Sequence, residues 1–137
     1  MELLEKLRAV LQAFPVVRLA AAFGSVARGS EHPRSDVDLA LLLDPDTPEL
    51  RQKIEADLGR AAGREVDLVF LDTAPPLLRF EIASDGVLLL ARDRNDWVDF
   101  RARAMIDWWD WAPTARLINE AAIRRLREKA GPPHGTT

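Results

Sequence analysis

The sequence contains no cysteine, no tyrosine and only two histidines among its 137 residues. Without cysteine, disulfide frameworks and thiolate zinc sites are excluded. A histidine-based metal site is disfavoured as well, because His32 lies in a polar connection and His134 in a glycine- and proline-rich end. No apolar run approaches the length that crosses a bilayer, so we expect no membrane partner.

The chain also lacks an excess of positive charge. Its formal net charge is −3 and its isoelectric point is about 5.4, whereas a protein that binds nucleic acid usually presents a basic patch. We therefore expect no direct contact with nucleic acid. The first residues interleave charges with leucines and do not follow the order of a signal peptide, so a cytoplasmic location is expected.

Hydrophobic residues make up 47% of the chain, which is enough for one core in a chain of this length. Apolar spacing predicts strands at about 17–23, 37–43, 64–71 and 87–90, the last of them fully buried. The same spacing predicts helices over 2–13, 48–62, 75–84 and 94–112, with Thr47 as an N-cap and Gly63 as a stop. The expected fold class is α/β (α+β), a small mixed sheet of about four strands flanked by helices.

The C-terminal part is rich in tryptophan. In the helix expected over 94–112, one stripe carries Trp97, Phe100, Ala104, Trp108 and Trp111, with Val98, Met105 and Trp109 beside it. One interpretation is that these rings cover the sheet. The other is that part of this surface binds a partner or a second copy of the chain.

Pro113 is expected to end this helix, and Thr114 to cap a further one. The predicted division is a domain over 1–112, a C-terminal helix over 113–130 and a disordered tail over 131–137.

A glycine-serine pair follows the first predicted strand. Gly24 permits a close approach of the backbone to a ligand, and Ser25 adds a hydroxyl beside the free N–H groups of a short helix. This combination predicts a binding site for phosphate.

Two carboxylates follow after ten further residues. Asp36 and Asp38 share one face at the start of an apolar strand. Two neighbouring like charges are unfavourable unless a cation resolves them, and magnesium is held by one or two carboxylates together with substrate phosphates. The structural alternative makes Ser25 an N-cap and Asp36 a turn residue, but it leaves Asp38 unexplained inside an apolar run.

The pair Gly24-Ser25, followed at this spacing by Asp36-Val37-Asp38, resembles the signature of the nucleotidyltransferase superfamily that includes DNA polymerase β. The small size is similar to its minimal branch, the MNT proteins encoded beside HEPN-domain toxins. The resemblance implies the polymerase β-like fold and a third metal-associated carboxylate on a downstream strand. Asp67 matches that position, and Glu65 is its competitor at the strand edge.

This resemblance implies transfer of AMP from ATP to a tyrosine of a cognate HEPN ribonuclease toxin, which silences the toxin. Asp36, Asp38 and Asp67 would be the catalytic residues and hold two Mg²⁺ ions. Gly24 and Ser25 would bind the β- and γ-phosphates of ATP, with Arg28 as a further donor. His32 and Arg34 lie in the same connection but carry no special pattern.

Two alternatives remain open. The chain would instead be a small-molecule nucleotidyltransferase of the aminoglycoside type, acting as a homodimer whose second subunit completes the pocket. Or it would be an antitoxin that only binds, blocking its partner through the tryptophan helix. Because the chain has no tyrosine, it is not itself a tyrosyl acceptor.

Overall fold

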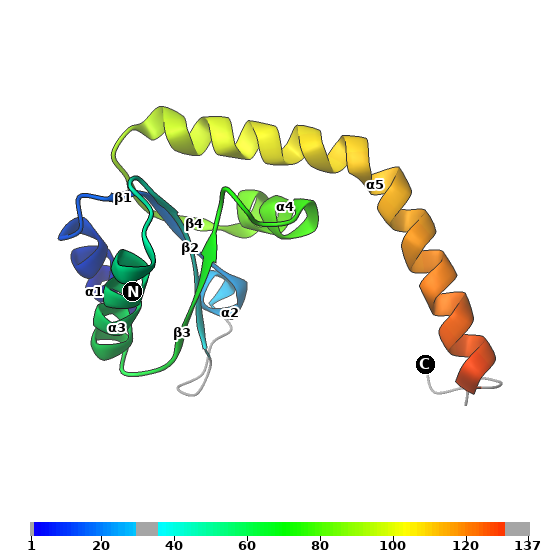
Figure 1. Cartoon of the computed structure of the whole chain (residues 1–137), viewed down its shortest axis with the longest axis horizontal. Helices are drawn as coiled ribbons and strands as arrows, with labels where there is room; N and C mark the ends of the chain where they lie inside the picture. The colour runs from blue at the N-terminus through cyan, green and yellow to red at the C-terminus, as the bar shows by residue number, and fades with distance from the viewer. Residues whose placement is uncertain (1, 30–35, 131–137) are drawn as a thin grey trace.

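A computed structural model describes residues 2–29 and 36–130 (Figure 1). In chain order the elements are α1 (Glu2–Gln12), β1 (Val17–Phe23), α2 (Gly24–Arg28), β2 (Val37–Leu43), α3 (Pro48–Ala62), β3 (Val66–Phe70), α4 (Pro76–Asp85), β4 (Val87–Ala91) and α5 (Arg94–Ala130). The expected mixture of strands and helices is confirmed. No helix within the described ranges is both long and apolar enough to span a membrane. His32, Arg34 and the tail expected over 131–137 lie outside the described residues.

The four strands form one mixed sheet in the order β3-β2-β1-β4. β1 lies antiparallel to both β2 and β4, while β2 and β3 run parallel. As a result the end of β1 lies beside the start of β2, and the start of β3 lies on the other side of β2. The two halves of the sequence motif, which flank the connection between β1 and β2, therefore meet at one end of the sheet.

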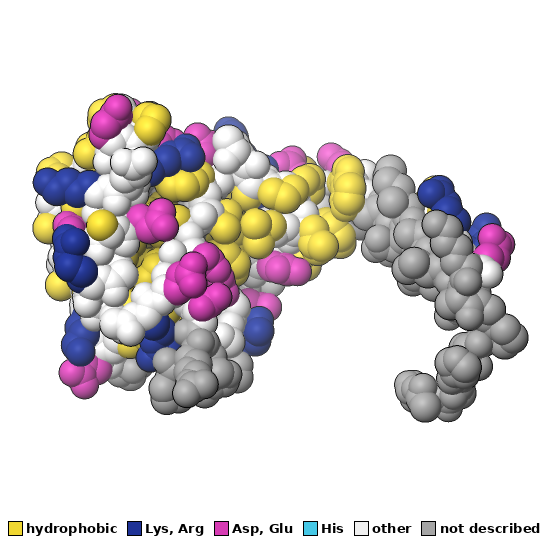
Figure 2. Space-filling view, turned by 60° about the horizontal axis from the view of Figure 1, so that its bottom comes forward, with side chains coloured by type: hydrophobic (Ala, Val, Ile, Leu, Met, Phe, Trp, Pro, Cys, Tyr) yellow, Lys and Arg dark blue, Asp and Glu magenta, His cyan; other side chains and the backbone are white. Residues whose placement is uncertain are grey.

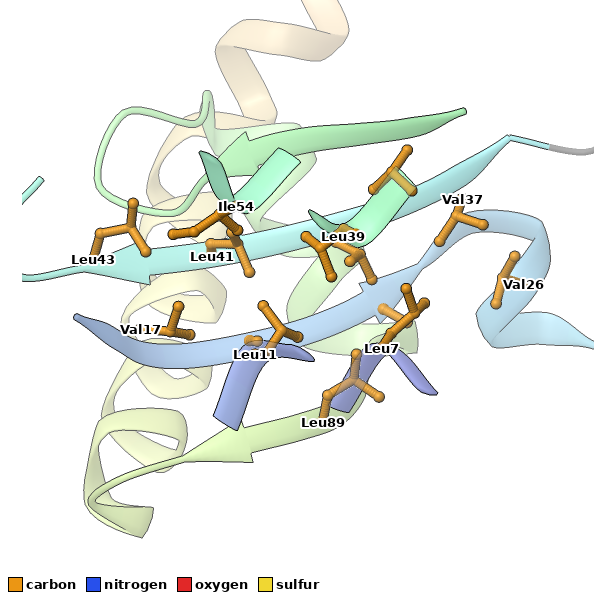
Figure 3. Packing of buried hydrophobic residues seen from close by; sticks show 14 residues of the cluster. Leu7, Leu11, Val17, Val26, Val37, Leu39, Leu41, Leu43, Ile54 and Leu89 are labelled. Carbon is orange, nitrogen blue, oxygen red and sulfur yellow. The ribbon is translucent and has the colours of Figure 1, made fainter. Parts of the chain in front are cut away.

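Helices cover both faces of the sheet, as Figure 1 shows. On one face, side chains of α1 and α3 pack onto alternating residues of β1 and β2, and Figure 3 shows this packing for Leu7, Leu11 and Ile54 against Leu39 and Leu41. The other face carries α4 and the first part of α5. Strand alternation places Asp38 on the same face as Ala40, which is the α4/α5 face.

The ends of α3 follow the local signals of the sequence. Thr47 caps the helix, since its Oγ1 accepts a hydrogen bond from the Leu50 N–H at 3.2 Å, and Pro48 occupies the first turn. Gly63 ends the helix in the left-handed region, with φ 66°. The sequence-based bounds of this helix are confirmed.

The expectation that the fourth strand is fully buried is wrong. Only Leu89 of β4 is buried, because β4 is an edge strand that pairs with β1 alone. An arginine of α1 protects this edge, as Arg8 Nε donates a hydrogen bond to the Leu89 carbonyl at 2.8 Å. A short apolar run does not reveal whether a strand lies at the centre or at the edge of a sheet.

The expectation that Pro113 ends a helix is also wrong. α5 runs from Arg94 to Ala130 with Pro113 inside it, and Figure 1 shows that the helix bends in its middle. Proline removes one backbone donor and its ring crowds the carbonyl four residues earlier, which kinks a helix without always ending it.

Candidate active site

The candidate site lies where β1 ends and β2 begins. Phe23 at the end of β1 pairs with Asp38 in the antiparallel register, and Asp38 pairs with Asp67 in the parallel register. A local motif and a distant strand thus bring two carboxylates to neighbouring positions. Asp36 is exposed just before β2, and Glu65 is exposed just before β3. The register therefore favours Asp67 over Glu65 as the neighbour of Asp38.

Gly24 is required by the geometry of the site. Its φ of 73° lies in the left-handed region, and a Cβ atom built on it would stand 2.6 Å from Asp38 Oδ2. The backbone at Gly24 and the Asp38 carboxylate therefore approach each other more closely than any other residue would allow. Ser25 and Arg28 follow in α2, a helix of five residues whose Val26 is buried in the core.

The electrostatics of Asp38 reflect this crowding. Burial raises the pKa of Asp38 above its usual value, and the negative charges of Asp67 and Asp36 raise it further, whereas the Arg28 guanidinium lowers it. Arg28 is thus close enough to act on Asp38. A carboxyl group in such surroundings gains from a bound cation, which neutralises the repulsion.

A hollow of about 380 Å³ opens at this point. Its lining comes from the end of β1, from α2, from the start of β2 and from α4, and comprises Phe23, Gly24, Arg28, Asp38, Glu81 and Asp85. The pocket joins predicted residues to two carboxylates of α4 that sequence reasoning missed. Their only local signal is that acidic residues are placed in the last turns of a helix, where the helix dipole disfavours them.

The chemistry of the donor set fits a hard divalent cation, since all its ligands are carboxylate oxygens. Among the described residues, however, no three Asp, Glu or His side chains are close enough together to make a complete metal cage. Magnesium usually retains water and takes further oxygens from substrate phosphates. The arrangement suits a cation that arrives with a phosphate ligand.

Comparison with known proteins extends these observations. The 30%-identical Protein adenylyltransferase MntA of Shewanella oneidensis aligns over 83 residues, and the alignment covers 60% of each chain. This chain thus spans about 60% of the length of that curated relative.

Two solved structures share the fold. A chain in the crystal structure of a toxin-antitoxin complex with AMP-PNP has a TM-score of 0.73 at 25% identity, covering 87% of this chain and 98% of that chain. A chain in the structure of tri-AMPylated Shewanella oneidensis HEPN toxin in complex with MNT antitoxin has a TM-score of 0.68 at 22% identity, covering 88% and 96%. At 22% identity, the similarity to the second of these structures shows a shared fold and no more.

The profile of the family described as "Polymerase beta, Nucleotidyltransferase" matches residues 5–95. This segment runs from α1 past the end of β4 and so includes all four strands and both halves of the motif. Since the match covers most of the chain, the protein belongs to the polymerase β nucleotidyltransferase family.

Proposed function

We propose that this chain transfers AMP from ATP to a tyrosine hydroxyl of a HEPN-domain ribonuclease toxin and thereby acts as its antitoxin. The observation that carries the proposal is the position of Asp38, which lines the pocket against Gly24 and pairs in the parallel register with Asp67 of the neighbouring strand. Family membership supports nucleotidyl transfer. The name of the relative, a protein adenylyltransferase, supports a protein acceptor.

Mg²⁺ is the cofactor that these residues fit. Asp36 and Asp38 would hold two ions, and Asp67 would complete the ligands on the acceptor side. When bound, the ions would neutralise charge on the phosphates and on the attacking and leaving oxygens. Gly24 and Ser25 would bind the β- and γ-phosphates, and Arg28 would donate hydrogen bonds to the same oxygens.

The proposed reaction is a single in-line displacement. The acceptor hydroxyl oxygen forms a bond to the α-phosphorus of ATP, and the bond from that phosphorus to the oxygen bridging to the β-phosphate breaks. AMP remains on the acceptor and pyrophosphate leaves. Asp67 would take the hydroxyl proton or help to lower the pKa of that hydroxyl. Because ATP is the donor, the reaction is expected to take place in the cytoplasm.

The acceptor must belong to another molecule if it is a tyrosine, since this chain has none. The complexes whose chains share this fold contain a toxin and an antitoxin, and one of them contains a tri-AMPylated HEPN toxin. A partner that brings its own hydroxyl also fits a domain whose described part has no separate acceptor-binding half.

Intact mass spectrometry of the protein encoded by the neighbouring gene tests this proposal. The partner is co-expressed with the wild-type chain or with the Asp36→Ala/Asp38→Ala variant, in magnesium and ATP. We expect mass added in units of AMP with the wild-type chain only. A stable complex without added mass in both cases would contradict transfer to that partner.

A second candidate function is neutralisation by binding alone. It is favoured by exposed apolar side chains on α5, since Trp109 is 70% exposed, Ile106 54% and Leu117 68%. Figure 2 shows apolar side chains along the part of the molecule where α5 leaves the body. If binding alone suffices, Asp36→Ala/Asp38→Ala still neutralises the partner, whereas Trp109→Ala does not.

A further inference from the structure

The wall that α4 contributes to the pocket is acidic. Glu81 and Asp85 lie four residues apart on α4 and both line the pocket that contains Asp38 and Gly24. Both are exposed, and neither makes a hydrogen bond or ion pair with any described residue. Their charges are therefore available to something that enters the pocket.

The orientation of α4 is fixed by other residues of the same helix. Ile82 is fully buried in the cluster beneath α5, and Phe80 stacks on Trp108 with ring centroids 5.2 Å apart. Arg79 pairs with Asp107 of α5 at 2.9 Å. These contacts hold Glu81 and Asp85 towards the pocket, although carboxylates at the end of a helix are disfavoured by its dipole.

The two walls of the pocket differ in charge. The α2 wall offers the backbone at Gly24 and the guanidinium of Arg28, whereas the α4 wall offers two carboxylates. Asp38, at the start of β2, lies between these walls in the lining of the same pocket. An anionic nucleotide is attracted to the α2 wall and repelled by the α4 wall. The space beside α4 is left for the acceptor.

We propose that Glu81 and Asp85 form the acceptor side of the pocket and select a segment that carries an arginine or lysine next to the acceptor hydroxyl. This inference rests on the proposed function, because it assumes that a protein segment enters beside the nucleotide. Each carboxylate would pair with a cationic side chain as the segment binds, and the paired charges would be partly shielded from water by the pocket walls.

Two short peptides test the proposal. Both contain one central tyrosine; one carries flanking arginines and the other carries citrulline, which keeps the shape of arginine without its charge. Dissociation constants for the full chain are measured at low ionic strength by the anisotropy of a fluorophore on the peptide, with AMP-PNP and Mg²⁺ present. AMP transfer from ATP to each peptide is measured separately.

We expect the wild-type chain to bind the arginine peptide at least about threefold more tightly than the citrulline peptide, the size of effect that one or two partly exposed ion pairs produce. Glu81→Gln/Asp85→Asn should bind both peptides equally. The matched control is Glu49→Gln/Glu55→Gln, which removes two exposed carboxylates from α3 on the opposite face of the sheet. It should keep the preference.

Three results would overturn the proposal: equal or undetectable binding of the two peptides by the wild-type chain, loss of the preference in the α3 control, or a weaker affinity for AMP-PNP in the α4 variant with the peptide preference intact. The last result would assign the two carboxylates to the nucleotide or its cation. If the preference is found but neither a peptide nor the neighbouring protein receives AMP, the proposed function is contradicted, while the role of Glu81 and Asp85 as the acceptor side of the pocket is supported. If AMP is transferred but the arginine peptide is not preferred over the citrulline peptide, only the proposed role of Glu81 and Asp85 is contradicted.

Discussion

Asp38 places a charge where the metal-free fold does not favour it. Its pKa is raised in the folded chain, so the folded state holds the proton more tightly than the unfolded state does. The stability that this group contributes is therefore complete below the pKa of an unfolded aspartate, about 4, and is lost as pH rises through the higher folded pKa. At pH 7 the ionised Asp38 opposes folding unless a cation is bound.

Asp38→Asn should accordingly stabilise the metal-free chain at pH 7. We expect a rise in Tm of about 2 °C or more, measured by circular dichroism in the presence of a chelator, together with loss of AMP transfer. The difference from wild type should disappear below about pH 4, where the carboxyl is protonated in both states. Asp99→Asn, an exposed carboxylate on α5, is the control. A lower Tm for Asp38→Asn at pH 7 would contradict this account.

With cation and nucleotide bound, we expect the wild-type chain to have a higher Tm than Asp38→Asn. Mg²⁺ with AMP-PNP should raise the Tm of the wild-type chain by mass action and leave Asp38→Asn nearly unchanged. Removing Mg²⁺ with a chelator should return the wild-type Tm to its original value. Equal stabilisation of both proteins by Mg²⁺ and AMP-PNP would show that the cation binds elsewhere.

Gly24 and Gly63 form a matched pair of glycines with positive φ. Gly24→Ala and Gly63→Ala both force alanine into the left-handed region, at a cost of about 1–2 kcal/mol in the free energy of unfolding. Only the Cβ at Gly24 would also meet Asp38, at 2.6 Å, whereas nothing lies within 4 Å of the Cβ at Gly63. Urea unfolding should show a larger loss for Gly24→Ala, and AMP transfer should be lost in that variant alone. Similar activity in both variants would contradict the proposed role of Gly24.

Among the helices and strands, α5 differs most along its length, because its first turns are buried and its later turns are exposed. Trp97, Phe100 and Ala104 are buried against the sheet and α4, while Trp109 and Leu117 are exposed. The interpretation that these rings cover the sheet is therefore confirmed for the first turns of the helix. The later turns expose apolar side chains, and that they bind a partner or a second copy of the chain remains a prediction. Pairing of Arg79 with Asp107 and stacking of Phe80 on Trp108 mark the end of the packed part.

Substitution along α5 should distinguish these two parts. Trp97→Ala should lower the free energy of unfolding by about 3–5 kcal/mol, as expected for a buried aromatic side chain. Trp109→Ala should change it by no more than about 0.5 kcal/mol, but should weaken binding to the partner protein. Urea unfolding and co-purification of the partner measure the two effects. Strong destabilisation by Trp109→Ala would show that this side chain is needed for folding.

Taken as a whole, the protein consists of a sheet with its covering helices and a distal part of α5 that extends beyond them (Figure 1). Among the side chains that the structure describes, Trp108 is the last of α5 with a ring contact or ion pair to the body, and the family profile ends at residue 95. The division into a domain over 1–112 and a C-terminal helix over 113–130 remains a prediction. A chain ending at residue 112 should unfold cooperatively, with a Tm within a few degrees of that of the full chain. Loss of cooperative unfolding would show that the distal helix is part of the folding unit.

Those features of the protein that depend on neighbours along the chain could be predicted from the sequence. Strand alternation placed Asp38 on one face of β2, Thr47 and Gly63 delimited α3, and the spacing from Gly24 to Asp38 identified the superfamily. Each of these follows from backbone geometry within a few residues, or from a motif that one turn and one strand complete. The candidate site could be predicted to this extent, including Asp67, whose position was implied by resemblance.

Features that depend on packing between distant segments emerge from the folded structure instead. It brought Asp67 into register with Asp38, because strand pairing is set by the whole sheet. It also leaves β4 at the edge of the sheet, and an apolar run does not distinguish an edge strand from a central one. Likewise α5 continues through Pro113, and the sequence pattern does not distinguish a kinked helix from one that ends. The folded structure also turns Glu81 and Asp85 towards the pocket. On the sequence alone these are two ordinary acidic residues of a helix, and the contacts of α4 with α5 give them their place.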